Sequence, residues 1–126
     1  MKHRDLPKEI VINKLISTSF DSPKTNLMVY NWCNKVLPLI QFVENERVKL
    51  IQKYGTIDKE TDKISVKPDK MQEFFKEFNE VLDMDIEIPK LELTENSFDD
   101  DKCQYPIDKS LWLTPQEIGI ILNISK

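Results

Sequence analysis

The chain has 126 residues, of which 40% are hydrophobic and 32% are charged, a balance typical of one soluble globular domain that needs no disulfide or metal to fold. Two glycines are too few for loops that cradle phosphates or dinucleotides, because such loops need glycine where the backbone approaches the ligand. A net charge of −4 and the lack of an apolar run of about 18 residues argue against a general nucleic-acid binder, an anionic-membrane binder and a transmembrane helix.

The N-terminal segment, residues 1–22, gives a mixed signal. Residues 8–19 carry isoleucines at spacings that suit either a strand or a short helix, and we favour a short helix or a strand-to-helix transition. The start, MKHRDLPKEIV, has neither an apolar core nor a small-residue cleavage site, so no secretory signal is expected. His3 is expected to be mobile, as residues near a terminus commonly are.

A long helix is predicted from Pro23 to Tyr54. Ser22 suits its N-cap, and Pro23 suits the first helical position, where no backbone donor is needed. Apolar residues repeat in sevens along this helix, in two rows that Arg47 alone interrupts. Such a stripe requires one continuous partner surface.

Two residues are expected to disturb or end the long helix. Pro38 removes a backbone donor and clashes with the preceding turn, so we expect a kink or break near residues 35–37. Gly55 is well placed to end the helix in the left-handed conformation.

A polar excursion and a second helix follow. The stretch TIDKETDKISV predicts two short strands joined by a tight turn, which we interpret as a connector. Pro68 and Asp69 suit the opening of a helix. Its apolar residues recur with helical spacing: Met71, Phe74, Phe75, Phe78, Val81 and Leu82. The three phenylalanines are expected to pack on the first long helix, forming an antiparallel helix pair.

A strand is predicted over residues 84–93, because apolar and acidic residues alternate there and Pro89 marks an edge or bulge. Residues 94–110 read as an acidic polar loop. Thr114 and Glu117 form a capping box that opens a short last helix within residues 111–126.

The predicted fold is therefore α+β: an antiparallel pair of long helices with a β-hairpin at its tip, a small antiparallel sheet and a short C-terminal helix. One domain, residues 1–126, is expected. It comprises the N-terminal segment 1–22, the helical hairpin plus strand 23–93, the acidic loop 94–110 and the C-terminal helix 111–126.

The residues offer little for catalysis or metal binding. His3 is the only histidine, no serine lies in a glycine-flanked elbow, and no compact ligand cluster suits zinc or calcium. Cys33 and Cys103 are expected to be reduced thiols, with Cys33 inert in the helix core. With 22 acidic residues, a close carboxylate pair carries no specificity. We expect no enzyme, no cofactor and no metal.

An acidic band offers a candidate protein-binding surface. Eight acidic residues against one lysine lie between positions 83 and 101, and three of them share a face of the predicted strand. This band can present negative charge to a basic protein, or it can be an ordinary solvated face that discourages aggregation. Trp112, between two leucines, is a further candidate contact residue. The candidate partner-binding residues are Asp83, Asp85, Glu87, Glu92, Asp99, Asp100, Asp101 and Trp112.

The order of elements resembles that of small proteins of unknown function from tailed bacteriophages and prophages, particularly of low-GC Gram-positive hosts. The likeness covers most of residues 27–123 and is carried by ERVKLIQKYG, by DKMQEFFKEFNEVLDMDIEI and by LTPQEIGIIL. It implies a phage or prophage setting and an α+β fold built on a helical hairpin. That family has no catalytic motif to carry over to this chain.

Three function classes remain, of which the third, a small enzyme, is disfavoured by the missing base and the missing glycine loop; the other two are as follows. One is an accessory protein in the host cytoplasm that binds a host or phage protein, inhibiting a host or rival system through its acidic face. The other is a structural or assembly component of the virion that acts as a homo-oligomer. Both are protein-binding functions, with no direct nucleic-acid or membrane contact expected.

Overall fold

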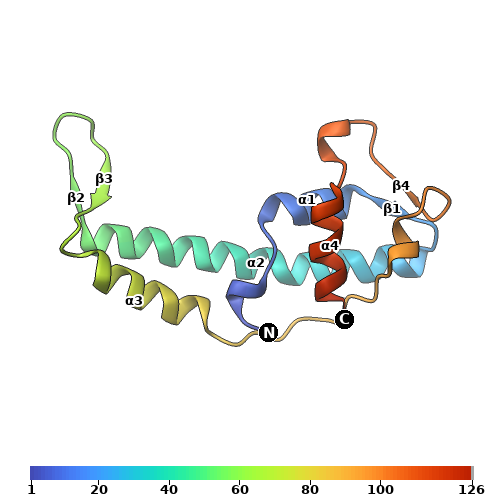
Figure 1. Cartoon of the computed structure of the whole chain (residues 1–126), viewed down its shortest axis with the longest axis horizontal. Helices are drawn as coiled ribbons and strands as arrows, with labels where there is room; N and C mark the ends of the chain where they lie inside the picture. The colour runs from blue at the N-terminus through green and yellow to red at the C-terminus, as the bar shows by residue number, and fades with distance from the viewer. Residues whose placement is uncertain (126) are drawn as a thin grey trace. The chain divides into compact units, whose positions relative to one another are not determined.

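The computed structural model describes residues 1–125 and confirms the α+β fold, with four α-helices and two small antiparallel sheets (Figure 1). Lys126, the last residue of the predicted segment 111–126, lies outside the described residues. Contacts divide the chain into two compact units. We call Met1–Leu6 with Leu39–Glu87 the hairpin unit, and Pro7–Pro38 with the described residues from Ile88 onward the core unit.

The first two helices lie where the sequence predicts them. Helix α1 spans Glu9–Ser17, and helix α2 spans Pro23–Tyr54, passing from the core unit into the hairpin unit after Pro38. The expected break before Pro38 is wrong, because α2 continues through it. Proline removes a single backbone donor, and the other hydrogen bonds of a 32-residue helix keep it continuous.

The hairpin unit contains the predicted helical hairpin. Strands β2 (Gly55–Ile57) and β3 (Ile64–Val66) pair antiparallel, with Ile57 opposite Ile64. Helix α3 (Met71–Leu82) then runs back beside the C-terminal part of α2 (Figure 1). Lys53 of α2 and Glu77 of α3 form an ion pair at 2.9 Å.

Gly55 ends α2 for a different reason from the one expected. No glycine has a positive φ, so the left-handed termination is wrong. A Cβ on Gly55 would instead collide with the carbonyl oxygen of Ile51 and lie 2.6 Å from Cγ2 of Ile64. Glycine is required here because α2 turns directly into β2 and the chain passes close to its own last helical turn.

The N-terminus is held against the hairpin unit, and the expected mobility of His3 is wrong. His3 lies in a 3₁₀ helix, η1 (His3–Asp5), and is buried. Its Nδ1 and its backbone N–H both donate to the carbonyl oxygen of Met84 at 3.2 Å. Its ring lies 5.8 Å from that of Phe42, and the N–H of Ile86 donates to the Met1 carbonyl at 2.8 Å. These contacts are far apart in sequence, so terminal position alone did not reveal them.

The segment 84–93 is not the predicted strand. Its only pairing in the described chain is an isolated bridge between Lys2 and Asp85, and Leu91 and Leu93 are buried as irregular backbone. Alternating burial of side chains therefore occurs here without a ladder, because no neighbouring strand supplies one. The small sheet lies elsewhere, between β1 (Ser19–Phe20) and β4 (Cys103–Gln104).

Residues 94–110 hold more structure than a polar loop. They include β4 and 3₁₀ helix η2 (Glu95–Phe98), and a further 3₁₀ helix, η3 (Lys109–Leu111), begins at their end. Phe98 is buried and meets Phe20 edge-on at 5.7 Å. The last helix, α4 (Pro115–Ile124), starts at the predicted capping box: the Thr114 hydroxyl accepts from the Glu117 N–H at 3.2 Å, and the Glu117 carboxylate accepts from the Thr114 N–H at 2.9 Å.

Candidate protein-binding surface

Buried apolar side chains are distributed very unequally between the two units. Of the 16 buried apolar residues in the described chain, 14 belong to the core unit, and Leu50 and Phe74 alone belong to the hairpin unit. Among the core-unit residues, Trp32, Ile12 and Leu15 are completely buried. The core unit therefore has a packed interior, whereas the hairpin unit has almost none.

The hairpin unit also exposes large apolar side chains. Eight of the 15 exposed large apolar residues in the described chain belong to it: Met1, Phe42, Val48, Ile57, Ile64, Met71, Phe75 and Met84. Single exposed apolar residues are ordinary, but eight of them on a unit with two buried ones are not. The hairpin unit therefore exposes more large apolar side chains than it buries.

Helix α3 shows the imbalance most clearly. Phe74 is buried and meets the rings of Phe75 and Phe78 edge-on, at 5.4 and 5.9 Å. Phe75, however, is 54% exposed, so the expectation that all three phenylalanines pack on α2 is wrong for this residue. The apolar arc of α3 is wider than the side of it that faces α2, which leaves Phe75 and Met71 uncovered.

Three of the predicted acidic contact residues lie at the base of the hairpin unit. Asp83 caps the end of α3 and pairs with Arg4, whose Nε donates to Oδ1 at 2.6 Å. Asp85 bridges to Lys2 through the backbone, and Glu87 is exposed. Because these residues do not lie in a strand, they do not form the regular charged face that the alternating sequence predicts.

The other acidic candidates belong to the core unit. Glu92 is exposed, and its carboxylate lies 3.6 Å from Lys90. Asp99 follows η2, and its carbonyl oxygen accepts from the N–H groups of Lys102 and Cys103. Asp100 and Asp101 line an open hollow of about 320 Å³ beside β4. The predicted acidic band is thus divided between two units.

Trp112 lies at the surface of the core unit and is 42% exposed. Its ring stacks on Tyr105 with centroids 5.3 Å apart, and its Nε1 donates to the carbonyl oxygen of Pro106 at 2.6 Å. Lys109 Nζ lies 5.9 Å from the ring centroid. These contacts hold the indole in place while one side remains exposed, an arrangement that suits a contact residue.

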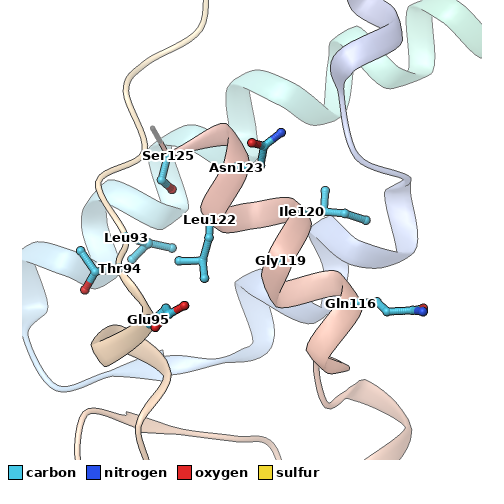
Figure 2. Close-up of a pocket in the computed structure, with 9 residues that line it drawn as sticks. All are labelled: Leu93, Thr94, Glu95, Gln116, Gly119, Ile120, Leu122, Asn123 and Ser125. Carbon is cyan, nitrogen blue, oxygen red and sulfur yellow. The ribbon is translucent and has the colours of Figure 1, made fainter.

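One hollow of the core unit is an open groove of about 970 Å³ beside α4 (Figure 2). Residues 93–95 run along one side, and Leu93 and Leu122 lie on facing sides. Gln116 and Asn123 add polar groups from α4. Glu95 is the only ionisable side chain among the described residues that line the groove.

The two cysteines are free and buried. Burial raises the pKa of the Cys33 thiol to about 12, which keeps it protonated and unreactive at neutral pH. Burial also raises the pKa of Cys103. Within residues 1–125, no group of three or more His, Cys, Asp or Glu side chains is arranged to hold a metal ion.

The sequence interpretation missed the exposure of Phe75 because it expected all three phenylalanines of α3 to pack on α2. One signal could have revealed this exposure: α3 carries six apolar residues in 12, more than one neighbouring helix covers. Comparisons of the chain with protein-family models, with curated proteins and with solved structures find no match. None of the helices in the described part of the chain is long and apolar enough to cross a membrane.

Proposed function

We propose that this protein acts without catalysis, by binding protein through its hairpin unit. The observation that carries the proposal is the contrast between eight exposed and two buried large apolar residues on that unit. Burying apolar surface contributes about 25 cal/mol per Å² to stability, so a helical hairpin that buries so little gains most from a partner. An exposed apolar surface with charged edges is also the usual composition of a protein-binding site.

The acidic residues supply the charged edge of this surface. Asp83, Asp85 and Glu87 lie at the base of the hairpin unit and are all exposed. Charges at the rim of an interface steer association and select partners more than they add affinity. In this proposal the acidic residues favour a partner with a basic patch, and the apolar residues provide the binding energy.

The biological setting is a proposal that rests on the resemblance to phage and prophage proteins. In that setting the protein is an accessory factor of the host cytoplasm that binds, and inhibits, a host or rival protein. The alternative is a structural or assembly component of the virion. A virion component assembles from many copies of one chain. If the partner of the exposed face of the hairpin unit is another copy of the same chain, that face favours the virion alternative.

The test compares the full-length tagged protein with two variants of α3. Phe75→Gln removes the most exposed ring of the helix, and the control Glu73→Gln places the same side chain about 160° further around α3. Each protein is incubated with lysate of a low-GC Gram-positive host, and retained proteins, including untagged copies of the chain, are identified by mass spectrometry. We expect Phe75→Gln to lose at least about tenfold of the retained partner, equivalent to about 1.4 kcal/mol, and Glu73→Gln to keep it.

The proposal fails if Phe75→Gln retains every partner, the chain itself included, as well as the unaltered protein does. Circular dichroism of both variants confirms that the helices remain. A third variant, Asp83→Asn with Asp85→Asn and Glu87→Gln, tests the acidic edge. Unchanged retention and unchanged salt dependence in that variant would remove the acidic residues from the proposal.

A further inference from the structure

One stripe of α2 within the hairpin unit has an unusual symmetry. Ile40, Glu44, Arg47 and Ile51 lie at spacings of four, three and four residues, which places them on one face of the helix as the seam of a coiled coil. None of the four is buried, and the side chains of Glu44 and Arg47 are 51% and 43% exposed. Ile40 and Arg47 belong to the row of every seventh residue that also holds Cys33 and Tyr54, the row that Arg47 interrupts.

The stripe is complementary to itself when its direction is reversed. Reversal about the point between residues 45 and 46 exchanges Ile40 with Ile51 and Glu44 with Arg47. A two-fold axis between antiparallel helices makes this exchange. Each isoleucine then meets an isoleucine of the second copy, and each carboxylate meets a guanidinium.

An ion pair between α2 and α3 identifies the side of the hairpin on which the stripe lies. Lys53 and Glu77 meet at 2.9 Å on one side of the α2–α3 pair. Ile51 and Phe75 each precede one of these residues by two positions, about 200° around their helices, so they lie together on the opposite side. Phe75 and Met71, both exposed, therefore lie on the same side of the hairpin as the stripe, beyond Ile51 towards the tip. We call Ile40, Glu44, Arg47, Ile51, Met71 and Phe75 the two-fold face.

The charge of the hairpin unit has the same symmetry. Residues 47–76, which include its tip, hold eight basic and five acidic residues. Residues 1–6, 39–46 and 77–87, which make up the rest of the unit, hold eight acidic and two basic residues. Reversal about the point between residues 45 and 46 places residues 47–54 of one α2, with three basic residues and no acidic one, beside residues 37–44 of the other, with Glu44 and no basic residue, whereas a parallel pair sets like segments together.

We infer that the two-fold face binds the same face of a second copy, with the two α2 helices antiparallel and the axis between residues 45 and 46. The inference rests on the proposed function and names its partner. Within one chain Arg47 already binds Glu44 through two hydrogen bonds, Nε to Oε2 at 3.0 Å and Nη2 to Oε1 at 2.6 Å. Across the two-fold axis, the Glu44–Arg47 pairs of the two copies form one layer of four charges between two layers of isoleucines. Such a polar layer fixes the register of the two helices.

The first test is the mass of the full chain in solution, measured by sedimentation over about 1 to 100 μM. We expect twice the chain mass of 14.9 kDa at the upper end, with dissociation as salt screens the charges of the two α2 segments. Ile51→Gln and Phe75→Gln should each raise the dissociation constant at least about tenfold. Glu73→Gln, on the opposite side of α3, should leave it unchanged.

Two further variants test register and direction. Arg47→Glu places acid against acid and should weaken association at least about tenfold, and adding Glu44→Arg should restore it, because the swapped layer is complementary again. For direction, Ile40→Cys and Ile51→Cys chains are mixed under oxidation. The antiparallel arrangement predicts disulfides between the two variants, whereas a parallel one predicts disulfides within each variant.

The outcomes separate this inference from the proposed function. A monomer at every concentration, with a lysate partner that Phe75→Gln still loses, overturns the second copy and leaves the protein-binding function standing. A monomer with no partner lost by Phe75→Gln overturns both. A dimer that Phe75→Gln leaves intact, or that forms disulfides only within each cysteine variant, overturns the two-fold face.

Discussion

Lys14 of α1 and Glu117 of α4 form an ion pair at 2.8 Å with side chains that are only 12% and 14% exposed. The same Glu117 carboxylate accepts a hydrogen bond from the Thr114 N–H and so caps α4. One carboxylate therefore joins the start of the last helix to the first helix of the core unit. Removing one partner of a pair as sheltered as this costs more than breaking an exposed pair, because the remaining charge is left poorly solvated.

This pair predicts a pH-dependent loss of stability. Burial raises the pKa of Glu117, but hydrogen bonds from Lys14 and Thr114 lower it by more, so the pKa lies below its ordinary value. A carboxyl with a lowered folded-state pKa contributes its stability above the unfolded-state pKa of about 4.3, and loses it as pH falls through the folded-state value.

Glu117→Gln, which keeps the capping side chain but removes its charge, should lower the free energy of unfolding by about 1 kcal/mol at neutral pH. Urea denaturation measures the change. The difference from the unaltered protein should shrink as the pH falls below about 4.3 and through the lowered pKa of the folded-state carboxyl. A difference that stays constant across this range would show that the charge of Glu117 contributes nothing.

The two glycines should respond oppositely to alanine. Gly55→Ala brings a Cβ against the Ile51 carbonyl and Ile64, so we expect a loss of about 1 to 3 kcal/mol and faster amide exchange in β2 and β3. Gly119→Ala meets nothing within 4 Å and lies inside α4, so it should stabilise by about 0.5 to 1 kcal/mol. Thermal unfolding of both variants checks the contrast. Equal effects would contradict the steric account of Gly55.

The N-terminal segment should stabilise the hairpin unit through His3 rather than Arg4. His3→Ala removes a buried ring and its hydrogen bond to Met84, which should cost about 1 to 3 kcal/mol. Arg4→Ala breaks an exposed pair with Asp83, which should cost less than about 1 kcal/mol. Urea denaturation gives the two values, and exchange of the Ile86 amide reports whether the segment has detached. A larger cost for Arg4→Ala would reverse this assignment.

The cysteines should report unfolding. Cys33 is fully buried and burial raises its pKa to about 12, so a thiol reagent should label it only when the core unit opens. Cys103 is slightly exposed and lies in a sheet of two strands with two residues each, so it should react faster. Mass spectrometry of a labelling time course orders the two sites. Labelling of Cys33 at a rate independent of added urea would mean that the thiol is accessible in the folded protein.

Local features were the ones that could be predicted from the sequence. The bounds of α2, the start of α4 at Thr114 and the paired strands around residues 57 and 64 all depend on residues a few positions apart. Caps, turns and helical periodicity depend on residues a few positions apart, so they can be recognised directly in the sequence. The α+β class follows from the order of these elements.

The candidate surface was only partly predictable. Acidic residues were found as a cluster in the sequence, yet Asp83 and Asp101 belong to different units. The exposed Phe75 was assigned to the core, because periodicity marks an apolar face without showing how much of it a neighbour covers.

The sequence by itself determined α2, α3 and α4, the capping box of α4, the β-hairpin and the burial of Cys33, because each depends on local spacing or on a continuous apolar row. Only the tertiary structure decided that residues 84–93 form no strand, that His3 is buried beside Met84, and that the hairpin unit keeps an open apolar face. The physical reason is the range of the interactions. Strand pairing and side-chain burial need partner residues that lie tens of positions away in the chain. The local sequence does not specify which of those residues come into contact.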